Sequence, residues 1–159
     1  MLKDVLVFFT LLFSLSVFAN DDARELEWSD LVPENYDVTT PDLEHIGQAM
    51  AGPQMINAPV VNELNGQLVK LPGFVVPLEG DDNKVTEFLL VPYFGACVHV
   101  PPPPSNQLVY VKIPEGAPAD AMYDPIWVYG VITTDSWSGE LAQVGYSMKG
   151  IKIAPYDDF

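Results

Sequence analysis

Apolar residues recur along the second half of the chain in a pattern that predicts β-strands. Residues 85–93 contain the uninterrupted run Phe88-Leu89-Leu90-Val91, which is typical of a strand buried on both faces. Residues 108–113 alternate instead, so that Val109, Val111 and Ile113 share one face. Together with the turn residues between the runs, this pattern predicts strands over residues 66–78, 85–93, 108–113 and 126–133, and a last strand or pair over 142–153.

The order and lengths of these strands favour a small five-stranded barrel of the oligonucleotide/oligosaccharide-binding (OB) type. The first strand is long, and Pro72-Gly73 predicts a bend or bulge in its middle. At most one helical turn, near residues 119–122, separates the third strand from the fourth. A β-sandwich or roll with a similar number of strands is the alternative, because periodicity does not distinguish the two. Neither architecture implies a function by itself.

Residues 20–65 precede this domain and are acidic and irregular. Trp28 and Leu31 predict a short anchored segment, and Thr40-Pro41 begins one or two helical turns that reach Gly47. We expect this arm to pack against the barrel of residues 66–159, although its composition is also compatible with a mobile arm.

The first nineteen residues are typical of an export signal. Lys3 supplies a positive charge, residues 5–18 are almost entirely apolar, and Ala19 fits a cleavage site. An uncleaved membrane anchor is the competing interpretation, but the run is short for a span of about 20 residues. We therefore expect cleavage, export and no stable membrane insertion of the mature protein.

The balance of charges is strongly acidic. The chain has 22 Asp and Glu residues against 7 Lys and Arg, a formal net charge of −15. Nucleic acids and anionic lipids both favour Lys and Arg, so we expect neither as a partner. Cations, basic partners or simple solubility remain compatible with this charge.

The candidate chemistry lies at Cys97 and His99, the single cysteine and one of two histidines. In an extended strand these side chains would point to the same face. A thiolate and an imidazole suit zinc or copper(I), with His45 or a carboxylate completing the site. They also suit a thiol nucleophile with His99 as its base. The structural alternative is a buried thiol beside a hydrogen-bonded imidazole.

Four consecutive prolines, Pro101 to Pro104, follow this pair. Their backbone must lie close to polyproline II and cannot occupy a central strand. We favour a rigid spacer between the Cys97/His99 segment and Asn106-Gln107. A ligand for an aromatic groove of a partner is the functional alternative.

Three segments together resemble the domain-of-unknown-function-3299 family of exported bacterial proteins. They are Trp28-Ser29-Asp30-Leu31-Val32-Pro33, the segment from Leu71 to Leu78, and the run from Phe88 to Gln107 with its Cys-x-His-x-Pro-Pro-Pro-Pro motif. The resemblance implies a periplasmic location in Gram-negative bacteria. It also implies an association of some members with metal transporter components, zinc in particular, which supports Cys97 and His99 as ligands.

These observations predict a periplasmic zinc-binding accessory protein linked to envelope metal transport, with Cys97, His99 and His45 as candidate ligands and transporter components as partners. A non-enzymatic scaffold that docks a transporter partner through the proline run is the alternative. A thiol enzyme that uses Cys97 is the second alternative, and we favour a non-enzymatic role over it.

Overall fold

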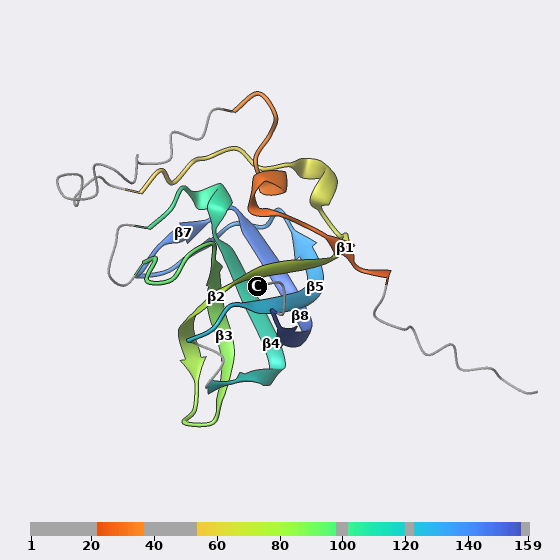
Figure 1. Cartoon of the computed structure of the whole chain (residues 1–159). Helices are drawn as coiled ribbons and strands as arrows, with labels where there is room; N and C mark the ends of the chain where they lie inside the picture. Colours follow the sequence, from red (N-terminus) through yellow and green to blue (C-terminus); the bar gives the residue numbers. More distant parts are fainter. Residues whose placement is uncertain (1–21, 37–53, 98–101, 120–122, 157–159) are drawn as a thin grey trace, which may run out of the picture.

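The computed structural model of the chain describes residues 22–36, 54–97, 102–119 and 123–156, and these residues form a mostly β structure (Figure 1). The strands are β1 (Arg24–Glu25), β2 (Leu68–Gly80), β3 (Lys84–Val91), β4 (Val109–Pro118), β5 (Ile126–Thr133), β6 (Trp137–Ser138), β7 (Gln143–Val144) and β8 (Tyr146–Pro155). The described residues also form short 3-10 helices η2 (Trp28–Leu31), η4 (Asn62–Leu64) and η5 (Ser105–Gln107).

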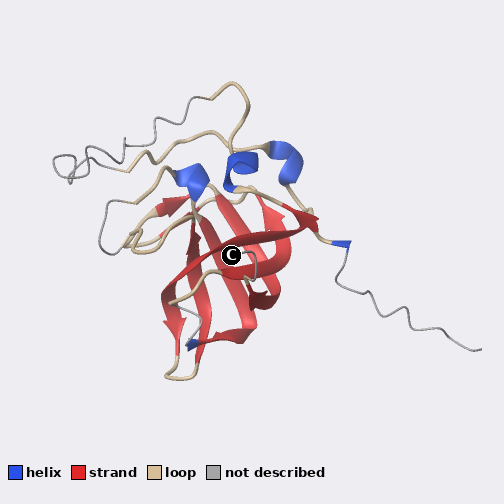
Figure 2. Cartoon of the chain, in the orientation of Figure 1, coloured by secondary structure: helices blue, strands red, loops and turns tan. Residues whose placement is uncertain are grey.

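Strands β2, β3, β4, β8 and β5 close into a barrel (Figure 2). The β2–β3, β3–β4 and β5–β8 pairs are antiparallel, whereas β4 and β8 are parallel. Closure comes from β2, whose residues 68–73 pair with β5 and whose residues 74–80 pair with β3. The predicted OB-like barrel is therefore confirmed over the sandwich or roll. β1 adds a further, parallel strand beside β2.

The bend predicted at Pro72-Gly73 lies where β2 changes partners. Gly73 pairs with Ile126 of β5, and the next residue, Phe74, pairs with Val91 of β3. A Cβ atom on Gly73 would lie 2.7 Å from the carbonyl oxygen of Val91. The absence of a side chain thus lets β2 approach β3 closely at the point where the barrel closes.

The inward-facing side chains of the five barrel strands form the main core. Side chains of the apolar run in β3 alternate between its two buried faces. Phe88 and Leu90 lie in the main core, while Leu89 and Val91 lie in a second cluster outside the barrel. The main core includes Val69, Leu71, Val75, Val85, Phe88, Leu90, Val109, Val111, Ile113, Ala117, Ile126, Val128, Ile132, Tyr146 and Met148. The predicted common face of Val109, Val111 and Ile113 is therefore confirmed.

The described parts of the N-terminal arm pack into the same core. Leu26, Leu31 and Leu64 are buried there, and Figure 1 shows η2 and η4 together at one end of the barrel. The buried Tyr146 hydroxyl donates to the Leu31 carbonyl at 2.8 Å and accepts from the Val61 N–H at 2.6 Å. One barrel side chain thus joins two arm segments that are about thirty residues apart.

Other predicted elements lie outside the described residues. These are the signal segment of residues 1–19, the helical turns of 41–47 and most of the turn at 119–122. Within the ranges that the structure describes, no helix has the length and apolar character that crossing a membrane requires.

Candidate functional site

The outer face of β2, β3 and β4 carries a second apolar cluster. In OB-folds the second and third barrel strands, here β3 and β4, form the face that binds oligonucleotides and oligosaccharides. Here that face is covered by the chain itself, through the β6–β7 hairpin and the turn of residues 93–97. The buried members are Val76, Leu89, Val91, Ala96, Leu108, Ala142 and Val144, and Phe74, Leu78, Cys97, Tyr110 and Trp137 pack partly buried against them.

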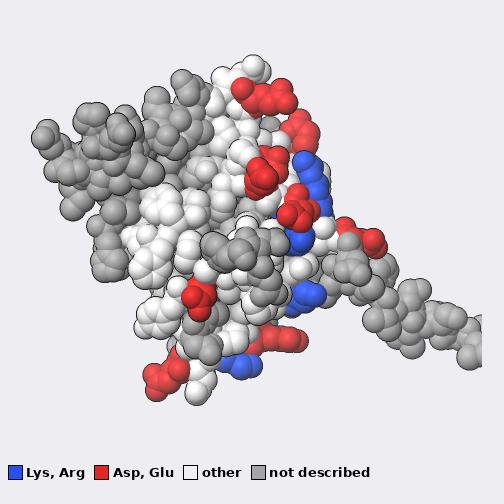
Figure 3. All heavy atoms as spheres, viewed as in Figure 1, with Lys and Arg blue, Asp and Glu red and all other residues white. Residues whose placement is uncertain are grey.

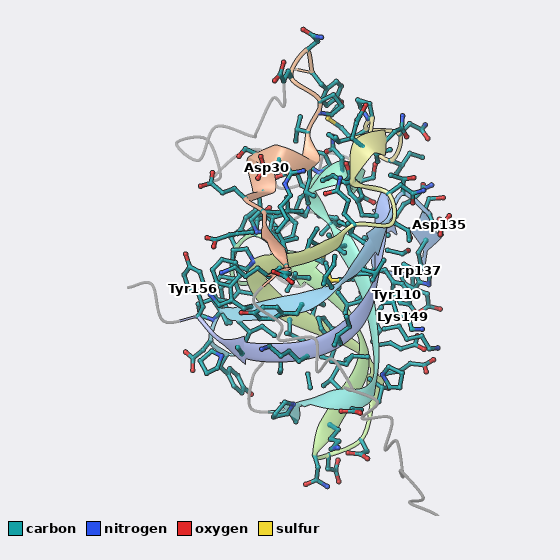
Figure 4. The ribbon with its side chains drawn as sticks, turned by 90° about the vertical axis from the view of Figure 1, so that its right-hand side faces the viewer. Asp30, Tyr110, Asp135, Trp137, Lys149 and Tyr156 are labelled. Carbon is teal, nitrogen blue, oxygen red and sulfur yellow. The ribbon has the colours of Figure 1, made fainter. Side chains whose placement is uncertain are left out.

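An aromatic stack fixes the hairpin to the barrel. The rings of Trp137 and Tyr110 are 4.8 Å apart and nearly parallel, at 4°. Figure 4 shows the two side chains side by side, one from the hairpin and the other from β4. Gly139 leaves room for the indole on the hairpin side, because a Cβ there would lie 2.0 Å from the ring of Trp137. Tyr110 is therefore already occupied by an internal stacking partner.

A row of charged residues crosses the same face beside this stack. Glu87 on β3 lies opposite Glu79 on β2 and opposite Lys112 on β4. Lys112 forms an ion pair with Glu87, and the Tyr110 hydroxyl donates to the other Glu87 oxygen at 2.5 Å. The hydrogen bonds from Lys112 and then Tyr110 lower the pKa of Glu87. Burial and the Glu87 hydrogen bond raise the pKa of Tyr110 to about 12, so it stays protonated.

The described part of the proline run and the residues after it are held by the arm. The Gln54 side chain donates to the carbonyl of the buried Pro103 at 3.0 Å. Asn106 donates to the Pro59 carbonyl and Gln107 to the Trp28 carbonyl, each at 2.8 Å. These contacts agree with a rigid spacer. Asn106 Oδ1 is buried without a hydrogen-bond partner among the described residues.

Cys97 lies at the edge of the second cluster and is half-buried. Its φ of 65° is left-handed, so the extended backbone from which we expected a common face with His99 is absent at Cys97. Burial raises the pKa of the thiol to about 11. His99 and His45 both lie outside the described residues.

The described ranges contain no group of three or more His, Cys, Asp and Glu residues placed to hold a metal ion. Of the three predicted ligands, only Cys97 is described, and its surroundings are apolar. Zinc binds the thiolate form, so a metal at Cys97 would have to displace a tightly held proton. Metal binding by Cys97, His99 and His45 stays a prediction.

An aromatic turn on this face is exposed to solvent. Phe94 is 60% exposed and Tyr93 44% exposed, directly after β3. The ring of Phe94 meets that of Phe74 on β2 edge-on, with centroids 5.9 Å apart at 73°. We name Phe74, Tyr93 and Phe94 the aromatic rim. It borders the covered cluster and leaves large apolar side chains open to solvent.

The family model of the proteins of unknown function DUF3299 matches residues 28–155. The chain belongs to the DUF3299 family. The resemblance found in the motifs is thus confirmed, whereas the periplasmic location stays a prediction. This DUF3299 protein is also similar to a crystal structure of a DUF3299 family protein from Pseudomonas aeruginosa PAO1. The two are 47% identical with a TM-score of 0.76, over 86% of this chain and 98% of the other. No curated protein matches the chain.

Two parts of this site were not predicted from the sequence. The stack of Tyr110 on Trp137 joins β4 to the β6–β7 hairpin, whose first strand we did not predict. The available signal was Tyr110 itself, an aromatic residue on the outward face of an alternating strand. The hydrogen bonds of the Gln54 side chain could not be predicted from the sequence, because their partners are backbone groups of residues far along the chain.

Proposed function

We propose that this DUF3299 protein is a non-enzymatic binding module that docks a polypeptide segment of a partner protein on the aromatic rim. The observation that carries the proposal is the exposure of Phe94 and Tyr93 beside Phe74. Aromatic side chains are enriched in protein interfaces and often supply most of the binding energy. The neighbouring stack of Tyr110 on Trp137 supports the idea that the surface beside the rim is rigid, which would reduce the entropy lost on binding.

The charge of the chain favours a basic partner segment over a second copy. A net charge of −15 makes two whole copies repel each other where a broad contact brings their acidic surfaces within the screening length of about 8–10 Å. Glu79 and Glu87 lie on the same face as the rim, with Lys112 as the neighbouring cation. Aromatic faces also attract lysine and arginine. The partner segment therefore combines apolar residues with Lys or Arg. A component of an envelope transporter is the partner that the family resemblance implies.

The rim is a better docking element than the proline run. Pro103 is buried and its carbonyl already accepts from Gln54, so the described prolines serve the protein's own packing. A free polyproline ligand would instead present its carbonyls and rings to a partner.

A peptide of lysines and leucines, compared with a glutamate-and-leucine peptide of equal length, tests the proposal. We expect the basic peptide to shift the NMR signals of Phe94 and its neighbours. Phe94→Ser should weaken binding about tenfold. The matched control is Tyr123→Ser, which removes another aromatic ring that is 72% exposed but belongs to the segment before β5 and not to the turn after β3. Equal effects of the two substitutions, or equal binding of both peptides, would refute the proposal.

Zinc binding linked to envelope metal transport is the second candidate function. The supporting observation is that Cys97 is half-buried at the edge of the second cluster, two residues before His99 in the sequence, and not in the barrel core. The test is metal analysis of untagged protein beside Cys97→Ala, His99→Ala and His45→Ala. Bound zinc that is lost in the variants supports the candidate, and negligible zinc in all four proteins refutes it. The raised pKa of Cys97 counts against its use as a nucleophile.

A further inference from the structure

Residues 54–61 of the arm lie against the end of the barrel and are held there through their backbone. In Figure 1 this segment is the golden trace beside η5. The Ser105 N–H donates to the Met55 carbonyl at 2.9 Å, and Ser105 Oγ accepts from the Ala58 N–H at 3.1 Å. Main-chain hydrogen bonds of this kind can hold a peptide with little regard to its sequence.

Asn106 uses only half of its side-chain amide on this segment. Asn106 is fully buried, at 0% exposure, and its Nδ2 donates to the Pro59 carbonyl at 2.8 Å. Its Oδ1 has no hydrogen-bond partner among the described residues. The amide of Gln54 shows the complete arrangement, because it accepts from the N–H and donates to the carbonyl of one residue, Gln143. Asn106 therefore makes one hydrogen bond where a primary amide can make two to the same residue.

Proline at position 59 explains the unpaired oxygen. Proline has no N–H, so the residue whose carbonyl Asn106 binds has no donor to offer to Oδ1. In an extended chain the next N–H on the same side is that of Val61, and this N–H already donates to the Tyr146 hydroxyl at 2.6 Å. A buried acceptor without a donor costs free energy. The chain's own segment thus satisfies Asn106 incompletely.

The side chains of the segment show which residues fit at each position. Ala58 is only 8% exposed, so position 58 takes a small residue. A Cβ on Gly145 would lie 2.8 Å from Cγ1 of Val60, so the glycine leaves the space that an apolar side chain at position 60 fills. Pro59 lies between them and is exposed. Position 59 therefore restricts the side chain little, and its backbone decides the fit.

The segment and the chain around it carry no charge. Residues 54–61, 102–108 and 141–146 contain no Asp, Glu, Lys or Arg. In Figure 3 the described atoms in the upper left of the view, where Figure 1 places this segment and β7, are mostly white. A charge buried here would find no counter-ion among these residues, so an uncharged segment is favoured. The aromatic rim differs, because it shares its face with Glu79 and Glu87.

We propose that Ser105, Asn106 and Tyr146 form a binding site for an uncharged segment of a partner polypeptide, and that residues 54–61 occupy this site in the free protein. We name it the arm site. The partner segment has a residue other than proline at the position of Pro59, and its N–H donates to Asn106 Oδ1. A second copy of this chain would bring the same proline, so a partner of different sequence is the occupant. The tethered arm competes at an effective concentration on the order of 1 mM, and the additional hydrogen bond allows the partner to replace it.

Synthetic peptides of residues 54–62, added to the full chain, test the inference. One has the native sequence, one carries Pro59→Ala, and one carries N-methylalanine at position 59, which keeps the alanine side chain but lacks the N–H. We expect the Pro59→Ala peptide to shift the NMR signals of Ser105, the Asn106 side chain and Tyr146. It should bind about tenfold more tightly than the other two, because it alone pairs with Asn106 Oδ1. Equal binding of the Pro59→Ala and N-methylated peptides, or no displacement of the arm by any peptide, would overturn the proposal.

The same substitution within the full chain gives a second, independent measurement. In Pro59→Ala the new amide at position 59 should exchange its hydrogen slowly, because it donates to the buried Asn106 Oδ1. The arm should then hold its place better, so the Pro59→Ala peptide should bind this variant about tenfold more weakly than it binds the native chain. Pro77→Ala is the matched control, since Pro77 pairs with Phe88 on β3, and it should leave peptide binding unchanged. Rapid exchange at position 59, or equal peptide binding by Pro59→Ala and the native chain, would overturn the proposal.

Discussion

The side-chain amide of Gln54 forms a two-way hydrogen-bonded pair with the backbone of Gln143, 89 residues further along the chain. Gln54 Oε1 accepts from the Gln143 N–H at 2.8 Å, and Gln54 Nε2 donates to the Gln143 carbonyl at 2.7 Å. The same Nε2 donates to the Pro103 carbonyl at 3.0 Å. One amide thus links the arm, the proline run and the β6–β7 hairpin that covers the outer face of the barrel.

Loss of this amide should loosen the hairpin. We expect Gln54→Ala to lower the free energy of unfolding by about 1–3 kcal/mol, because partly buried backbone groups of Gln143 and Pro103 lose their partner. Urea denaturation measures the effect. Gln143→Ala is the control, since its backbone groups remain, and it should cost less than about 0.5 kcal/mol. Equal losses in the two variants would contradict the role of the Gln54 amide.

The Tyr146 hydroxyl should contribute to stability by joining the arm to the barrel. Tyr146→Phe leaves the Leu31 carbonyl and the Val61 N–H without a partner, so we expect a loss of about 1–3 kcal/mol. Faster proteolysis of residues 22–36 would show that the arm has loosened. Tyr129→Phe, which keeps the ring beneath Lys152, should change stability by less than about 0.5 kcal/mol in the same denaturation experiment.

Gly73 should tolerate no side chain, for a steric reason. Its φ is not in the left-handed region, but a Cβ would meet the Val91 carbonyl and the Leu90 side chain at 2.7–3.0 Å. We expect Gly73→Ala to cost about 1–3 kcal/mol in thermal or urea unfolding. Gly66 presents the opposite case, with a φ of 81° and open space around it. Gly66→Asn should therefore be nearly neutral, since Asn adopts this conformation more readily than most residues.

Cys97 should react slowly with thiol reagents at neutral pH. Because its pKa is about 11, little thiolate is present near pH 7, and alkylation should accelerate about tenfold per pH unit up to about pH 11. The labelling rate of native protein, compared with that of protein unfolded in urea, measures this. Faster labelling of the native protein near pH 7 would contradict it.

The same raised pKa predicts a loss of stability in alkali. Burial disfavours the charged thiolate in the folded protein, so the contribution of the protonated thiol is complete below the ordinary thiol pKa of 9.0. This contribution to stability should fall as the pH rises from 9.0 through about 11, because the Cys97 thiol ionises at a lower pH in the unfolded chain than in the folded protein. Cys97→Ala should reduce the alkaline loss in urea titrations between pH 8 and 11. If Cys97→Ala leaves the dependence of the unfolding free energy on pH unchanged, Cys97 does not contribute to the loss of stability in alkali.

Local sequence patterns predicted most of the barrel. The predicted strand at 126–133 matches β5, and Pro72-Gly73 marks the residues at which β2 changes partners. The strand ends were less accurate, since β4 continues to Pro118 where we expected it to end at residue 113. Its extra residues pair with β3, and such long-range pairing overrides local propensity.

The candidate site was less predictable, because it depends on contacts between distant segments. The motif directed attention to Cys97 and His99, and the family assignment from that motif is confirmed. The left-handed backbone at Cys97 was not visible in the motif, since the surrounding turn, and not the residue type, imposes it. The exposure of Phe94 depends equally on where the turn of residues 93–97 lies against Phe74.

The sequence by itself determined the strand periods, the acidic charge, the bend in β2 and the family, because each depends on the local order of side chains. Only the tertiary structure decided which outer face is covered and which is open. Tyr110 meets Trp137 and Gln54 meets Gln143 only in the folded chain, and Lys70 and Lys152 lie over the rings of Trp127 and Tyr129 only when β2, β5 and β8 pair. Such contacts follow from barrel closure, which brings together residues that share no local pattern.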